Sequence, residues 1–321
     1  MTLVAHPKIQ TEISQPPGLE FHVGNTPLVP LRRIGLSLNL PPAVSIFAKT
    51  EWFNPGGSIK DRPALNIIRR ALDTGALTSN KHLLDSTSGN MGIAYATLGA
   101  SLGIPVTLTM PANASPERVA ILKALGADVI LTDPLEGSDG AILVARKMAA
   151  EKPDLYFYAN QYDNPANWEA HYCSTGPEIW SQTQGGITHF VAGLGTSGTL
   201  TGVGKYLREM NPDVQIIAGQ PDAPFHGLEG LKHMPTAIKP AIFDVNFPDR
   251  TLPVATESAY VMVRRLAREE GLFVGISSGA AAVAALRVAS ELESGIVVTV
   301  FPDAGYKYLS DTDLWHGGQR D

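Results

Sequence analysis

The sequence predicts an α/β protein built from wound, mainly parallel β-sheets, with enough chain for two lobes. Short apolar runs rich in Val, Ile and Leu recur along its 321 residues, and they lack the polar–apolar alternation of half-exposed strands. Helical patterns separate these runs, and loops rich in small residues stand before some of the helices. This alternation of strand and helix is typical of parallel sheets covered by helices on both faces.

The individual elements follow from local signals. Ser115 and Pro116 predict a helix start, since serine favours the N-cap and proline the first helical position, and Gly126 should end that helix. The stretch 221–253 is rich in Pro, Gly and His, which predicts a long excursion of loops. Eight strands are predicted, at residues 45–50, 82–87, 106–110, 128–133, 155–160, 189–194, 215–220 and 296–303.

Composition and charge exclude several classes of protein. Hydrophobic residues make up 44% and charged residues 17%, which indicates a globular chain rather than a disordered one. The net charge of −6 offers no basic surface, so neither nucleic acid nor membrane is expected as a partner. The N-terminal sequence lacks the features of a secretory signal, and no apolar run is long enough to span a bilayer.

The cysteine and histidine content predicts neither a disulfide nor a metal site. Cys173 is the only cysteine, which fits a reducing cytoplasm, and its residue type predicts a small buried side chain. His171 and His233 lack the spacing to acidic or cysteine residues that metal ligands show.

Three loops of small residues are expected to follow strands and to open helices. They read STSGNMG at 86–92, GLGTSGTLTG at 193–202 and GISSGAA at 275–281. In parallel sheets such loops lie together at the carboxyl ends of the strands, where ligands bind. Helix N-termini favour anions, so the three loops together predict a ligand with more than one anionic group.

Each loop also has a simpler interpretation. GLGTSG matches the glycine pattern of dinucleotide sites, and Asp222 ends the next strand, where such a site keeps its ribose-binding acid. A nicotinamide-dependent dehydrogenase is therefore an alternative on this loop alone. GISSGAA could reflect close packing of a helix on a strand, and STSGNMG an ordinary capping turn.

The setting of Lys60, in the stretch NPGGSIKDRP at 54–63, distinguishes a cofactor site from these simpler interpretations. Most lysines early in a helix are simply exposed. A cation is unfavourable at a helix N-terminus, however, and the positive end of the helix dipole lowers the pKa of an amine. A lysine with a lowered pKa is what Schiff-base chemistry with a carbonyl cofactor requires. Gly56 and Gly57 would let the backbone approach a flat ligand.

These motifs, in this order, resemble those of the fold-type-II pyridoxal-phosphate (PLP) enzymes, and within them the B-type cysteine synthases, which include phosphoserine sulfhydrylases. The resemblance extends to GNTPLVPL at 24–31, NQYDNPANWEAHYCSTGPEIW at 160–180 and PDAGYKYLS at 302–310, and so covers nearly the whole chain. It implies a tryptophan-synthase-β-like fold with two lobes. The smaller, mobile lobe would span 52–164 and carry the substrate-carboxylate loop, and the larger would combine 1–51 with 165–321 and carry the cofactor-phosphate loop. It also implies a cytoplasmic homodimer.

The resemblance assigns a role to each loop. Lys60 would bind PLP as an internal aldimine and then act as the general base. Asn90 would contact the 3′-oxygen of the cofactor, Ser277 its ring nitrogen, and Lys232 the anionic end of the substrate or of the sulfur donor. The cofactor phosphate would lie on Gly195, Thr196, Ser197, Gly198 and Thr199. The substrate carboxylate would lie on Thr87, Ser88, Gly89, Asn90 and Gln161.

The implied reaction is a β-replacement through an aminoacrylate, which makes L-cysteine from O-acetylserine or O-phosphoserine and a sulfur donor. Met91 departs from the family, because threonine is usual at this position and methionine cannot donate its hydrogen bond. Related enzymes that use an amine nucleophile to make diaminopropionate precursors carry an apolar residue there. That reaction stays open as an alternative, and the dehydrogenase as a more distant one.

Overall fold

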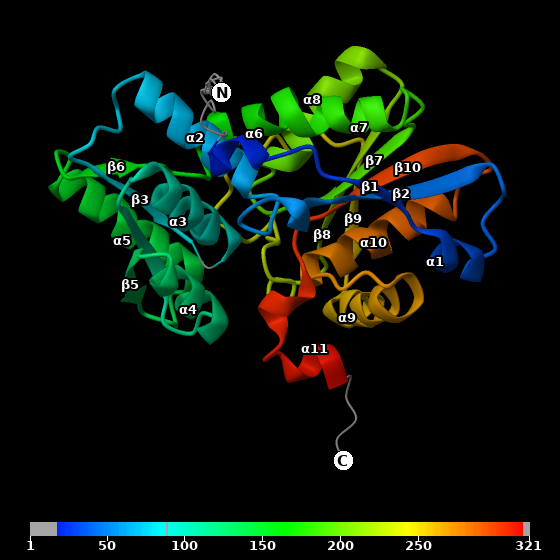
Figure 1. Cartoon of the computed structure of the whole chain (residues 1–321). Coiled ribbons are helices and arrows are strands. Elements are labelled where there is room, and N and C mark those ends of the chain that lie inside the picture. Colours follow the sequence, from blue (N-terminus) through cyan, green and yellow to red (C-terminus); the bar gives the residue numbers. More distant parts are fainter. Residues whose placement is uncertain (1–17, 88, 317–321) are drawn as a thin grey trace, which may run out of the picture.

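The computed structural model describes residues 18–87 and 89–316, which form two β-sheets with helices around them (Figure 1). The larger sheet has the strand order β1-β2-β10-β7-β8-β9, and within it only β1 runs antiparallel to its neighbour. Its strands are β1 (Leu28–Pro30), β2 (Val44–Thr50), β7 (His189–Gly193), β8 (Gln215–Pro221), β9 (Arg250–Val254) and β10 (Gly295–Phe301).

The smaller sheet is entirely parallel, in the order β5-β4-β3-β6. It lies at the left of Figure 1, beside α3, α4 and α5. Its central strand β4 is buried at every position, as expected for a strand covered on both faces. Its strands are β3 (His82–Ser86), β4 (Val106–Pro111), β5 (Asp128–Thr132) and β6 (Tyr156–Tyr158).

The helices connect these strands in wound α/β order. The α-helices are α1 (Arg32–Ser37), α2 (Asp61–Asp73), α3 (Asn90–Leu102), α4 (Pro116–Ala124), α5 (Gly137–Glu151), α6 (Ala166–Ala170), α7 (Gly176–Gln182), α8 (Gly198–Met210), α9 (Thr256–Arg265), α10 (Ile276–Ala289) and α11 (Thr312–His316). Shorter 3-10 segments are η1 (Leu19–His22), η2 (Glu51–Phe53) and η5 (Gly305–Tyr308), and η3 (His171–Thr175) and η4 (Leu266–Glu270) are π-helical.

The predicted α/β class with parallel sheets is confirmed, and a strand is found in each of the eight predicted segments. The helix predicted from Pro116 is α4, and Gly126 follows its end with φ +80°. Ser115 is the N-cap residue, although its hydroxyl donates to the Glu117 carboxylate (2.7 Å) instead of capping the backbone. The sequence analysis missed β1 and β9, the two edge strands of the larger sheet.

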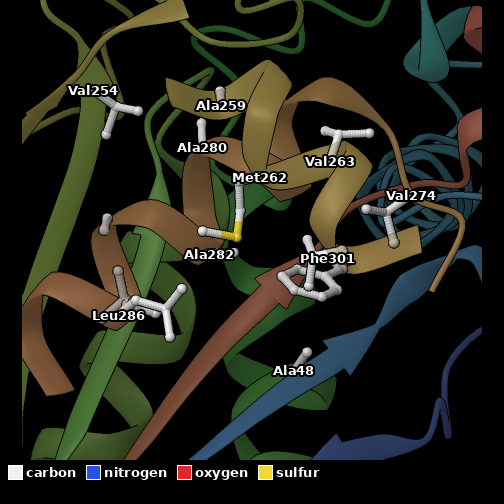
Figure 2. Packing of buried hydrophobic residues seen from close by; sticks show 14 of the residues in the cluster. Ala48, Val254, Ala259, Met262, Val263, Val274, Ala280, Ala282, Leu286 and Phe301 are labelled. Carbon is white, nitrogen blue, oxygen red and sulfur yellow. The ribbon is translucent and has the colours of Figure 1, made fainter. Parts of the chain in front are cut away.

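One hydrophobic core lies beside the larger sheet, where α10 packs against β10 and β2 and α9 packs against α10 (Figure 2). Met262 of α9 lies toward Ala280 and Ala282 of α10 in this core, and Val263 of α9 and Phe301 at the end of β10 belong to the same cluster. The small residues of α10 allow the two helices to approach closely. This packing fixes the start of α10, which belongs to the site described next.

Candidate active site

A cavity of about 160 Å³ is lined by residues of the larger sheet, by loops that follow strands of the smaller sheet and by the excursion 221–253. Its lining includes every predicted site residue within the described part of the chain; Ser88 lies outside the described residues. The site residues that line it are Lys60, Thr87, Gly89, Asn90, Gln161, Gly195, Thr196, Ser197, Gly198, Thr199, Lys232 and Ser277.

Lys60 is the N-cap residue of α2, at the end of the glycine elbow. Its backbone N–H donates to Ser58 Oγ (3.2 Å), and the preceding Ile59 N–H donates to the carbonyl of Pro302 (2.9 Å). Gly57 has φ +74°, a conformation that suits glycine. Burial lowers the pKa of the Lys60 amine, and the nearby carboxylate of Asp303 opposes this by raising it. A neutral amine is a nucleophile and a base.

The loop between β7 and α8 fits a phosphate group. Ser197 takes a left-handed conformation (φ +69°), and its buried hydroxyl has no hydrogen-bond partner among the described residues. In the first turn of α8 the Gly198 N–H donates to Thr196 Oγ1 (3.3 Å) and the Thr201 N–H to the Ser197 carbonyl (2.9 Å), whereas the N–H groups of Thr199 and Leu200 have no acceptor within the helix. A Cβ on Gly195 would lie 2.4 Å from the carbonyl of Gly230, so only glycine leaves this approach open. The donors and the unpaired hydroxyl match the oxygens of the PLP phosphate.

Two neighbours hold the threonines of this loop. Asn167 Nδ2 donates to Thr196 Oγ1 (3.2 Å) and to the carbonyl of Gln161 (2.7 Å). His171 Nε2 lies 3.4 Å from Thr199 Oγ1. Burial, and then the charges of Arg62 and Lys60, lower the pKa of His171 well below its usual range, so this imidazole is neutral.

The loop at 86–92 presents hydrogen-bond donors to the cavity. Thr87 Oγ1 accepts from the N–H groups of Gly89 (3.1 Å) and Gly92 (3.3 Å), which leaves its own O–H to donate. Gln161 Nε2 donates to the carbonyl of Ser86 (2.9 Å), and the Gln161 N–H donates to Asp85 Oδ2 (3.2 Å). Burial raises the pKa of Asp85 to about 7.

The structure adds charged residues that the sequence analysis did not select. Arg118 lines the cavity, stacks over the ring of Tyr308 (5.0 Å to the centroid) and pairs with Glu229 of the excursion. Behind the cavity wall, Asp303 and Lys307 are buried and contact Asn90. The signal that could have found this pair is PDAGYKYLS, which places an acid and a lysine four residues apart next to a buried strand.

Two expectations were wrong. The loop at 275–281 does not follow a strand: it comes after η4 and the isolated bridge between Val274 and Ala304. Ser277 nevertheless lines the cavity from the first turn of α10. Cys173 is exposed rather than buried, because it lies in the π-helical segment His171–Thr175, whose turn differs from that of an α-helix.

Several other features bear on alternative functions. Asp222, the residue proposed for a ribose in the dehydrogenase alternative, is exposed and is not among the residues that line the cavity. In residues 18–87 and 89–316, His, Cys, Asp and Glu nowhere gather in threes as a metal site would need. Among the helices of the same residues, none is both long and apolar enough for a membrane span.

Comparison with known proteins agrees with this geometry. The family model of pyridoxal-phosphate-dependent enzymes matches residues 19–303, and the chain belongs to that family. It is 56% identical to a cysteine synthase of Aquifex aeolicus over 292 residues, which are 90% of this chain and 89% of that protein. It is 44% identical to cysteine synthase B of Pseudomonas aeruginosa, with 92% and 97% of the two chains covered. A cysteine synthase structure from Entamoeba histolytica matches with a TM-score of 0.89 and 36% identity, over 98% of this chain and 94% of that one.

These matches confirm the fold-type-II class, the resemblance to cysteine synthases and PLP as the cofactor. Membership of this family decides against the nicotinamide-dependent alternative.

Proposed function

We propose that this enzyme is a cysteine synthase, which makes L-cysteine by replacing the β-substituent of an activated serine with sulfur. The main observation behind this proposal is that one cavity is lined by Lys60, by the loop between β7 and α8 and by the loop that contains Thr87. The relatives named cysteine synthase, at up to 56% identity, support the same reaction.

Bound PLP supplies a carbonyl for the Lys60 amine and an electron sink for the negative charge that develops at the substrate α-carbon. Gly195, Thr196, Ser197, Gly198 and Thr199 would hold its phosphate through N–H groups and hydroxyls. Asn90 would donate to its phenolic oxygen, and the Ser277 hydroxyl would be the partner of its ring nitrogen. A neutral hydroxyl cannot stabilise a protonated ring nitrogen as a carboxylate does.

The chain's own groups then direct the reaction. The Thr87 hydroxyl, with Ser88, Gly89, Asn90 and Gln161, binds the substrate carboxylate and orients the α-carbon. Lys60 Nζ removes the α-proton once its amine is free, a task that its lowered pKa favours. Loss of the β-substituent and addition of sulfur at the same carbon complete the replacement.

Lys232 is proposed to select for an anionic leaving group or sulfur donor. It lines the cavity, and its ammonium lies 3.7 Å from Asp139 Oδ1 and 5.0 Å from the centroid of the Tyr162 ring. A lysine provides a point charge without the bidentate fork of arginine, so we propose that both O-phosphoserine and O-acetylserine are accepted.

A β-replacement with an amine nucleophile is the second candidate, and Met91 is the observation that favours it. Met91 is 2% exposed, lines the cavity and offers no hydrogen-bond donor. Competition between sulfide and glutamate for O-phosphoserine separates the two reactions, since the product is cysteine in one and a diaminopropionate derivative in the other.

The direct test of the proposed function is a product assay. The purified enzyme with PLP, O-acetylserine and sulfide should form L-cysteine, and Lys60→Ala should not. Absence of cysteine with both activated serines and with both sulfide and thiosulfate would count against the assignment.

We further propose that the enzyme is a cytoplasmic homodimer, in which residues 52–164 move as the smaller lobe. The resemblance to cysteine synthases supports the dimer and the motion. One cysteine in 321 residues suits a reducing compartment.

A further inference from the structure

The side chain of Asn90 lies between two buried charged groups. Its Nδ2 donates to Asp303 Oδ2 (2.8 Å), and its Oδ1 accepts from Lys307 Nζ (2.8 Å). An ionised carboxylate has only acceptors and an ammonium only donors. Reversing the amide would therefore turn both hydrogen bonds into repulsive contacts, so these two neighbours specify one orientation of Asn90.

In that orientation, one N–H of the Asn90 amide remains available as a hydrogen-bond donor. Nδ2 carries two hydrogens, and Asp303 is its only acceptor among the described residues. Asn90 lines the cavity, whereas Asp303 and Lys307 are not among the lining residues. The second hydrogen is thus the one that a bound molecule can accept.

Three hydrogen bonds hold the Lys307 ammonium in place. Its ammonium also donates to the carbonyls of Gly57 (3.1 Å) and Gly56 (3.3 Å), so all three N–H groups have acceptors. The residue is 2% exposed. Lys307 thereby connects the glycine elbow before Lys60 to the amide of Asn90.

Asp303 is also held by hydrogen bonds, in addition to the one from Asn90. Tyr308 donates its hydroxyl to Asp303 Oδ2 (2.8 Å), and the backbone N–H of Gly275 donates to the Asp303 carbonyl (3.1 Å). Asp303 Oδ1 lies against Gly275, where a Cβ would be only 2.1 Å from it, so glycine at this position makes the room that the Asp303 side chain occupies.

We propose that Asp303 and Lys307 are positioning residues, which hold the Asn90 amide so that its remaining N–H is presented to the PLP ring. This inference rests on the proposed contact between Asn90 and the cofactor. It assigns a role to the segment PDAGYKYLS, whose charged residues do not themselves line the cavity.

The test is a double-mutant cycle on cofactor affinity. Apoprotein is titrated with PLP, and binding is followed by the Schiff-base absorption at roughly 410–430 nm. Lys307→Met should weaken PLP binding about tenfold, because it removes a charge-assisted hydrogen bond from Asn90. Lys307→Arg, which keeps charge and donors, should stay within about threefold of the wild type. Lys152→Met is the matched control, since Lys152 is exposed at the C-cap of α5, and it should bind PLP normally.

The cycle distinguishes positioning from a general structural role. In an Asn90→Ala background, Lys307→Met should change PLP affinity by less than about twofold, because its partner is gone. An equal loss in both backgrounds, or wild-type affinity of Lys307→Met, would overturn the inference. If Asn90→Ala alone binds PLP normally, the proposed contact of Asn90 fails and the inference fails with it, while cysteine formation is tested separately.

Where the apoprotein of Lys307→Met lacks the near-ultraviolet circular dichroism of the wild type, Tyr308→Phe replaces it. That variant removes only the hydroxyl that holds Asp303, and it should weaken PLP binding about threefold. Unchanged affinity of Tyr308→Phe would then overturn the inference.

Discussion

Lys232 and Asp139 form a charge pair at the cavity that allows the leaving-group proposal to be tested in both directions. We predict that Lys232→Met lowers kcat/KM for O-phosphoserine and leaves that for O-acetylserine nearly unchanged, because only the phosphorylated substrate presents a dianion. Asp139→Asn should do the opposite and raise kcat/KM for O-phosphoserine, since it frees the lysine from its carboxylate partner.

The magnitude follows from the geometry of the pair. Two unit charges 3.7 Å apart attract each other by roughly 4.5 kcal/mol at an effective dielectric constant of about 20. Solvent screens this pair, because the side chain of Asp139 is 42% exposed, and a net value of about 1 kcal/mol is realistic. A charge-assisted hydrogen bond from Lys232 to phosphate contributes about 1.5–3 kcal/mol. Because Lys232 gives up its pairing with Asp139 to make that bond, about 1 kcal/mol is subtracted from this contribution.

Lys232→Met should therefore cost about 0.5–2 kcal/mol in the transition state, a roughly 2- to 30-fold fall in kcat/KM for O-phosphoserine. Asp139→Asn should give a rise of about fivefold for the same substrate, which corresponds to the roughly 1 kcal/mol of the released pairing. Steady-state kinetics with both serines at a fixed sulfide concentration measures these ratios. Equal losses on the two substrates, or the same direction of change in both variants, would remove Lys232 from the leaving-group site.

Three further predictions concern packing, pH and motion. Gly195→Ala should lower the free energy of unfolding by about 1–3 kcal/mol, because its Cβ would lie 2.4 Å from the Gly230 carbonyl. Gly35→Ala, whose Cβ would meet only Leu40 at 3.7 Å, is the control, and equal urea midpoints would refute the packing argument. Burial raises the pKa of Asp61 from 3.8 to about 7, so the wild-type apoprotein should lose stability as the pH rises through this range. The stability advantage of Asp61→Asn should grow over the same range and then level off, and an advantage independent of pH would contradict this. Crystals with a bound amino acid should show residues 52–164 closer to the rest of the chain than without it, and an unchanged arrangement would argue against a mobile lobe.

The sequence was sufficient to predict the buried strands because their side chains carry the signal. The strand β4 is apolar or β-branched throughout, and every one of its residues is buried. The two missed strands are the edge strands of the larger sheet and carry weaker signals, whereas β5 and β6, the edge strands of the smaller sheet, were predicted. β1 is three residues long and ends in proline, and β9 has exposed residues at Arg250, Thr251 and Pro253.

The residues of the candidate site were likewise predicted only in part from the sequence. Loops of small residues that open helices were visible in the sequence, and each of the three contributes residues to the lining of one cavity. Asp303 and Lys307 were not selected, because a charged residue in a sequence is ordinarily exposed and only the tertiary fold brings these two against Asn90. Cys173 was misjudged for a related reason, since residue type alone does not report the local π-helical turn.

The central claim is that Lys60 carries the cofactor, and chemical trapping tests it most directly. Holoenzyme is reduced with borohydride and digested, and the modified peptide is identified by mass spectrometry. A single pyridoxyl group is expected on the peptide that contains Lys60, and none in Lys60→Ala, which should also be inactive. A pyridoxyl group on the buried Lys307, on Lys49 or on any other lysine, or none at all in PLP-loaded enzyme, would show that Lys60 does not carry the cofactor.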